Sequence, residues 1–160
     1  MKQLGQPATF NSPLEAGMRA VALLGASFPQ TYDLQRLVTF DFLLVHTGDV
    51  GGPDSLHPPT PYRPAELLVR RKLVEDALLL MMTRDLVQRE VTPDGFKYGA
   101  GENAATFLAS LPTNYFLAMK VRASWLVETF GHHSDHEFRA VLRQFLDDWV
   151  EEFQSIERSM

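Results

Sequence analysis

The sequence contains no cysteine among its 160 residues. Without a thiol, the chain can form no disulfide, no thiolate metal site and no cysteine nucleophile. This composition suits a reducing cytoplasm, where we expect the protein to be located. A chain of this length buries roughly 70% of its unfolded surface, so it needs no covalent or metal staple to fold.

Long apolar runs are also missing. The longest unbroken run is Ala77–Met82, which is far shorter than the ~20 residues of a membrane-spanning helix. The opening residues, MKQLGQPATFNS, lack the basic start and the apolar core of a signal peptide. We therefore expect a soluble chain with no membrane contact.

The sequence motifs of common enzymes are absent. There is no GxSxG nucleophile turn, no HExxH zinc motif, and neither the GxxxxGK nor the GxGxxG phosphate loop. The acidic pairs Asp147-Asp148 and Glu151-Glu152 lie opposite the aromatic stripe of the predicted last helix, which indicates a solvated or partner-facing surface. We expect no catalytic residue, no cofactor and no small-molecule substrate.

Positive charge is in deficit, because the formal net charge is -5. This balance disfavours non-specific nucleic-acid binding through overall charge. A local basic patch still provides candidate DNA contacts. The candidate DNA contacts are Arg70, Arg71 and Lys72 on a helix, with Arg89 and Lys97 on the following hairpin. The three helix cations stand at helical pairing distance from Glu66, Glu75 and Asp76, which favours a self-neutralised, solvated helix face over a DNA contact.

A group of histidines with one aspartate resembles a metal site at first sight. It comprises His132, His133, Asp135 and His136. Adjacent histidines cannot easily converge on one ion, and the same segment serves as a helix break followed by a capping box. We therefore expect no metal here. A site formed by Asp49, Asp54 and His57 is expected even less.

Helix caps and apolar spacing predict a mainly helical fold with one β-hairpin. The order predicts a winged helix-turn-helix-like domain over residues 1–112, with a helical extension over residues 113–160 packed on it. The alternative is an α-rich domain whose hairpin only covers a core edge. The predicted elements are helices over residues 12–27, 31–48 and 64–84, a hairpin over 86–101 that turns at Pro93-Asp94-Gly95, and helices over 101–111, 113–130 and from Ser134 onward.

The predicted last helix carries large apolar residues at helical spacing on one face. Such a stripe is usually core, and that interpretation is favoured. The alternative is a helix-in-groove contact with another protein, in which Trp149 and Phe153 would be the anchors. The stripe consists of Phe138, Leu142, Phe145, Trp149, Phe153 and Ile156.

Five segments in order carry a family resemblance over about residues 10–131. The chain resembles the middle component of bacterial ABC three-component systems. The resemblance implies a small, non-catalytic, winged-helix-like subunit beside an SMC-like ABC ATPase and an effector, often a nuclease. Such complexes act against phages and plasmids, as in Lamassu-type systems. The segments are FNSPLEAGMRAVALLGASFP, DLQRLVTFDFLLVHTGD, GGPDSLHPP, RPAELLVRRKLVEDALLLMMTRDLV and NYFLAMKVRASWLVETFG.

The sequence leaves three functions open. The first is an adaptor that joins the ATPase to the effector and touches DNA only within the complex. The second is a winged-helix transcriptional regulator that uses the basic patch. The third is an enzyme built on the histidine group, which requires a bound metal. The Gly/Pro-rich loop over residues 48–64 is much longer than the turn of a DNA-reading helix-turn-helix, and this favours the adaptor.

Overall fold

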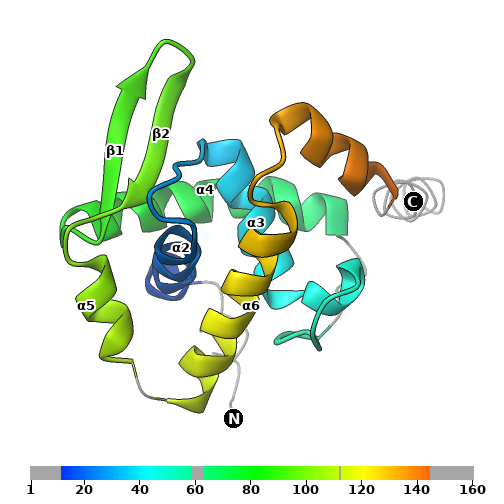
Figure 1. Ribbon diagram of the computed structural model, residues 1–160, viewed down its shortest axis with the longest axis horizontal. Helices are drawn as coiled ribbons and strands as arrows, with labels where there is room; N and C mark the ends of the chain where they lie inside the picture. The colour runs from blue at the N-terminus through cyan, green and yellow to red at the C-terminus, as the bar shows by residue number, and fades with distance from the viewer. Residues whose placement is uncertain (1–11, 59–62, 112, 145–160) are drawn as a thin grey trace.

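The computed structural model describes residues 12–58, 63–111 and 113–144, and only the backbone of residues 63–68. These residues form a helical body with one antiparallel hairpin (Figure 1). The prediction of a mainly α fold with one hairpin is confirmed. The elements are α2 (Pro13–Ser27), α3 (Leu34–Val45), η2 (Thr47–Val50), α4 (Arg63–Met82), β1 (Val87–Thr92), β2 (Gly95–Ala100), α5 (Ala104–Ala109) and α6 (Asn114–Phe130), followed by helical residues 135–144.

Side-chain caps fix where several helices begin. Ser12, Asp33 and Thr113 each accept a hydrogen bond from the backbone N–H three residues further along. Ser134 and Glu137 form the predicted capping box, in which each side chain binds the other residue's backbone N–H at 3.1 and 2.8 Å. These bonds satisfy donors that the first turn of a helix leaves unpaired.

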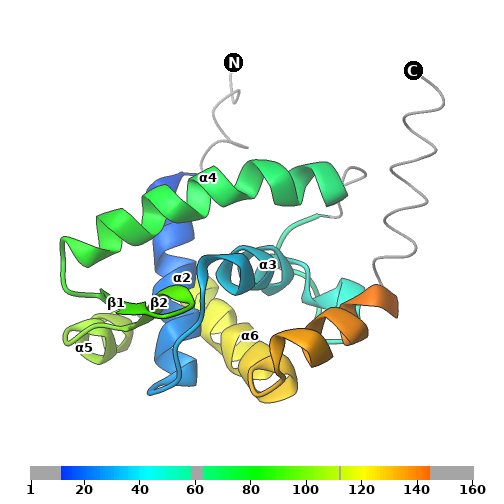
Figure 2. The same cartoon turned by 90° about the horizontal axis from the view of Figure 1, so that it is seen from above.

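The helices pack in layers around one core. Helices α2 and α3 lie in the middle, with α4 on one side and α6 on the other (Figure 2). Side chains from both sides of residue 112 share this core, so α6 and residues 135–144 are part of the same packed body; the domain division at residue 112 stays a prediction. The core includes Leu23, Leu24, Phe40, Leu43, Leu78, Met119, Leu126, Phe130, Phe138 and Leu142.

The hairpin projects from the helical body (Figure 1). Its strands pair from Val87 with Ala100 at the base to Thr92 with Gly95 at the turn. The base is tied to the body through Tyr32, which precedes α3. The backbone of Tyr32 exchanges two hydrogen bonds with that of Tyr98, at 2.9 and 2.7 Å.

The Tyr32 bridge places a short extended segment between α2 and α3. The chain order is then helix, bridge, two helices and hairpin. The winged-helix assignment stays a prediction. Over its described residues, the long loop after α3 contains only one short helix, η2, as expected for a Gly/Pro-rich stretch. Within the described ranges, no helix combines the length and apolar character needed to cross a membrane.

Candidate protein-interaction site

A buried ionic cluster holds three helices together. Asp41 of α3 accepts a bond from Arg19 Nε of α2 at 2.7 Å and from Arg70 Nη1 of α4 at 2.5 Å. Burial alone would raise the pKa of Asp41, but the two guanidinium groups outweigh burial and hold the pKa below its usual value. Asp41 is therefore an ionised carboxylate, and its role here is to hold the three helices together.

The cluster corrects one prediction for the basic patch. Arg70 was expected on an exposed face, but the residue is only 5% exposed and its side chain is bonded to Asp41. The side chain of Glu66, its predicted partner, lies outside what the structure describes. Arg70 lies at helical spacing from the buried Val74 and Ala77, so it faces the core. A phosphate outside the protein cannot reach this guanidinium.

The other candidate DNA contacts lie nearer the surface. Arg71 is exposed and donates to Gln35 at 3.1 Å. Lys72 is exposed and forms its predicted i,i+4 pair with Asp76 at 2.7 Å. Arg89 is exposed and Lys97 is partly buried; both are on the hairpin. The structure therefore places these four cations on two separate elements.

The histidine segment joins α6 to the last helical residues. Arg36 of α3 donates to the carbonyl of His133 at 2.9 Å and to Asp135 at 3.0 Å. Its guanidinium also lies 4.2 Å from the ring centroid of Phe138. Asp135 thus serves as an ion-pair partner. In the part of the chain that the structure describes, no three His, Asp or Glu side chains are grouped to hold a metal ion.

The loop histidine His57 packs beside the ionic cluster. Its Nε2 lies 3.2 Å from the hydroxyl of Tyr115 on α6. The pKa of His57 falls to about 4, first because burial disfavours the charged ring and next because Arg19 is nearby. His57 is therefore neutral at pH 7 and helps fasten the long loop to α6.

The tip of the hairpin exposes apolar side chains. Val91 and Phe96 are opposite each other, 79% and 46% exposed. Arg89 lies on the same face, with its guanidinium 4.3 Å from the centroid of Phe96. At the base, this face carries the buried Val87 and Tyr98. One apolar face thus begins in the core and continues into solvent, which is typical of a surface that another protein covers.

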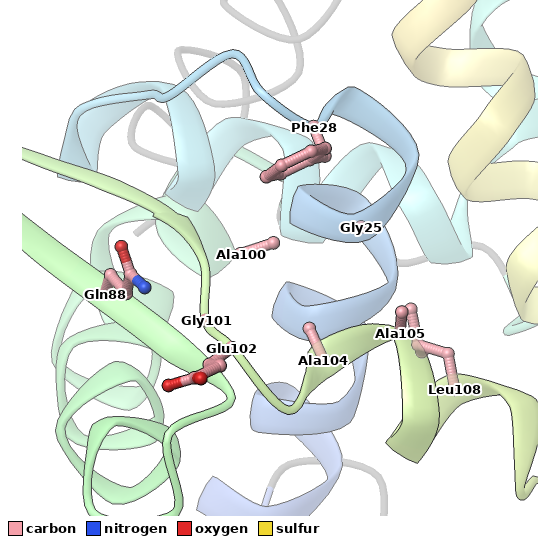
Figure 3. Close-up of a pocket in the computed structure, with 9 residues that line it drawn as sticks. All are labelled: Gly25, Phe28, Gln88, Ala100, Gly101, Glu102, Ala104, Ala105 and Leu108. Atoms are coloured by element: carbon pink, nitrogen blue, oxygen red, sulfur yellow. The ribbon is translucent and has the colours of Figure 1, made fainter.

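A pocket of about 520 Å³ lies at the base of the hairpin. It opens between the end of α2, the two strands and α5 (Figure 3). The ring of Phe28 stands at its rim and is 69% exposed. A volume of this size is in the range of pockets that bind ligands. The pocket is lined by Gly25, Phe28, Gln88, Ala100, Gly101, Glu102, Ala104, Ala105 and Leu108.

The predicted aromatic stripe of the last helix is only partly described. Phe138 and Leu142 are buried in the core, as the favoured interpretation expects. Trp149 and Phe153, the candidate partner contacts, lie outside the described residues. Sequence reasoning missed Arg19, Asp41 and Arg36 as organising residues, and it also missed the pocket beside Phe28.

Comparison with known proteins identifies one family. Residues 9–152 match the family model described as ABC-three component (ABC-3C) system Middle Component 2. Searches of curated proteins and of solved structures give no match. The family match covers nearly the whole chain, including the hairpin and the pocket.

Proposed function

Because the chain belongs to the Middle Component 2 family of ABC three-component systems, we propose that it is a non-catalytic adaptor subunit. It links an SMC-like ABC ATPase to an effector, such as a nuclease, in a Lamassu-like complex directed against phages and plasmids. The family match supports membership of a multi-protein system. The ATPase, the effector and the defence role are the proposed part.

The apolar tip of the hairpin is the observation that carries the adaptor proposal. Val91 and Phe96 expose apolar surface at the end of a projecting element, where they contribute little to the core. Aromatic and aliphatic side chains in such positions become anchors when a partner removes them from water.

The outer edge of β1 is a second place where a partner could bind. The backbone of Tyr98 bonds to Tyr32 and not to the opposite Arg89, so the N–H and C=O of Arg89 point to the outer edge of β1. Among the described residues, no strand pairs with that edge, and a partner strand could add there.

Co-expression tests the adaptor directly. The chain is tagged and produced together with the two other components encoded in its own system. We expect it to co-purify with both and to migrate with them as one complex in size-exclusion chromatography. A monomer that elutes apart from both components would overturn the proposal. Trp149→Ala with Phe153→Ala tests whether those two side chains are further anchors.

DNA contact within the complex is proposed through the four predicted basic residues that remain when the buried Arg70 is set aside. Arg71 and Lys72 lie on α4, and Arg89 and Lys97 lie on the hairpin. Replacing all four with Ala should weaken binding of the complex to a 30-base-pair duplex and flatten its salt dependence by about 0.9 per lost phosphate contact. Arg139→Ala with Arg143→Ala, on a different helical segment, is the control. Tight, sequence-selective binding by the isolated chain would instead favour the transcriptional regulator.

A further inference from the structure

We propose that the pocket at the base of the hairpin receives an extended segment of another component of the same system. That segment inserts an apolar side chain beside Phe28 and places a lysine or arginine next to Glu102. The inference rests on the proposed adaptor function and adds to it the chemistry of the contact.

The lining favours an apolar insertion. Most of the wall is formed by aliphatic or aromatic carbon and by glycine backbone, and Ala105 and Phe28 expose theirs to solvent. A free protein leaves such surface in water at a cost of about 25 cal/mol per Å². The volume of about 520 Å³ is large enough for a bulky side chain together with its flanking backbone.

The charge of the lining predicts which kind of residue stands next to the inserted apolar side chain. Glu102 is the one ionisable group among the nine lining residues, and Gln88 adds an amide that can donate or accept. Among the described residues, no cation lines this larger pocket, so a phosphate or a carboxylate placed in it would meet only negative charge. An arginine or lysine complements Glu102, and the charge of Glu102 disfavours a nucleic-acid phosphate in this larger pocket.

Close contacts at two glycines position the walls of the pocket. Leu108 packs against α2 where residue 25 is glycine, since a Cβ there would lie 2.5 Å from Leu108 Cδ1. Gly101 passes against the backbone of Asp85, where a side chain has no room, and donates to Leu86 O at 2.9 Å. One wall is therefore positioned by a side-chain contact at Gly25 and another by backbone packing at Gly101.

A second hollow extends the pocket along the hairpin. It has a volume of about 140 Å³ and shares Phe28, Gln88 and Ala100 with the larger pocket. Polar side chains line its other end, and the charged ones are Arg89, Glu90 and Lys97. The two hollows together form a groove that suits an extended segment, with its apolar side chain at the α5 end.

The first test fills the pocket. Ala105→Trp places an indole on an exposed lining position, and Ala109→Trp places the same group on an exposed position of α5 outside the pocket. The wild-type chain is first shown to assemble with the two other components. We then expect Ala105→Trp to weaken assembly by roughly tenfold or more, with Ala109→Trp close to wild type.

The outcomes separate the two proposals. If the wild-type chain does not assemble, the adaptor function fails, and the pocket proposal fails with it. If it assembles and both tryptophan variants bind equally well, the pocket proposal is overturned and the adaptor stands. Thermal unfolding of each variant confirms that the fold is kept.

The second test addresses charge. Glu102→Lys should weaken assembly, and Glu128→Lys, an equal change on an exposed position of α6, should not. A photo-reactive benzoylphenylalanine at position 105 then identifies the segment by cross-linking and mass spectrometry. We expect a segment with an apolar residue beside a lysine or arginine, and reversing that cation to Glu should restore binding to Glu102→Lys. Cross-links confined to residues 1–11 of this chain, or to a segment without a cation, would overturn the proposal.

Discussion

The carboxylate of Asp41 on α3 lies 2.7 Å from Nε of Arg19 on α2, and both side chains are almost completely shielded from solvent. Arg70 of α4 approaches the other carboxylate oxygen. One buried anion thus joins all three helices that surround the hairpin's attachment, and its loss removes the carboxylate that both arginines share.

Asp41→Asn should therefore destabilise the protein by about 3–5 kcal/mol, because removing one partner of a buried ion pair is far more costly than removing one partner of an exposed pair. Urea unfolding followed by circular dichroism measures the change. Asp76→Asn is the matched control, since it removes the partner of the exposed Lys72 and should change stability little. A small effect at Asp41 would mean that the two arginines find other partners.

His57 makes stability depend on pH. Its pKa is about 4 in the folded chain and about 6.5 when unfolded. Between these values the unfolded chain binds a proton that the folded chain does not, so stability is full above pH 6.5 and falls as the pH drops toward 4. The stability lost is on the order of 2 kcal/mol, because the partial exposure of His57 reduces the free energy that the whole pKa shift would otherwise contribute.

The pH dependence can be assigned with one variant pair. His57→Gln keeps a polar group near Tyr115 and should remove this part of the slope in urea unfolding measured from pH 7 to pH 4. His132→Gln, which alters an exposed histidine, should leave the slope as in wild type. If the His57→Gln curve runs parallel to wild type over this range, His57 is not the group responsible.

Arg36 fastens the last helical residues to α3. Replacing it with Met removes bonds to His133 O and Asp135 and the contact with the Phe138 ring. The expected loss is about 2–3 kcal/mol, since bonds to charged groups are stronger than neutral ones. Hydrogen exchange over residues 135–144 should accelerate more than exchange in α2. Arg139→Met, at an exposed position of the same segment, should leave both rates unchanged.

The hairpin tip should matter for assembly and not for folding. Val91→Thr with Phe96→Ser removes exposed apolar surface, so the free energy of unfolding should change by about 0.5 kcal/mol per position or less. Affinity for the other components should fall roughly tenfold if the tip is an anchor. Isothermal titration calorimetry measures the affinity. Thr83→Ser, at an exposed position away from the tip, is the control.

The sequence predicts the elements well because their signals are local. Ser12, Thr113 and the Ser134–Glu137 box mark helix starts within three residues of chain, and the Pro93-Asp94 turn fixes the hairpin. Local signals also predicted the Lys72–Asp76 pair. They depend on neighbouring residues and need no knowledge of tertiary packing.

Arg70 was assigned to the surface because it stands in a basic triplet, although its helical spacing to Val74 and Ala77 was available in the sequence. Asp41, likewise, interrupts an otherwise apolar run on α3. An acid and a base that both fall on buried stripes are expected to pair, and this signal could have been used. The pocket could not be predicted, since it depends on how α2, the hairpin and α5 meet in space.

Tyr32 has a consequence for how movement travels through the molecule. Its backbone holds the hairpin at Tyr98, and its hydroxyl donates to the carbonyl of Gly131 at the end of α6, at 3.2 Å. Gln30 binds that same carbonyl at 2.8 Å. We therefore expect a displacement of the hairpin to be transmitted through Gln30 and Tyr32 to the end of α6, where the C-terminal helical segment begins.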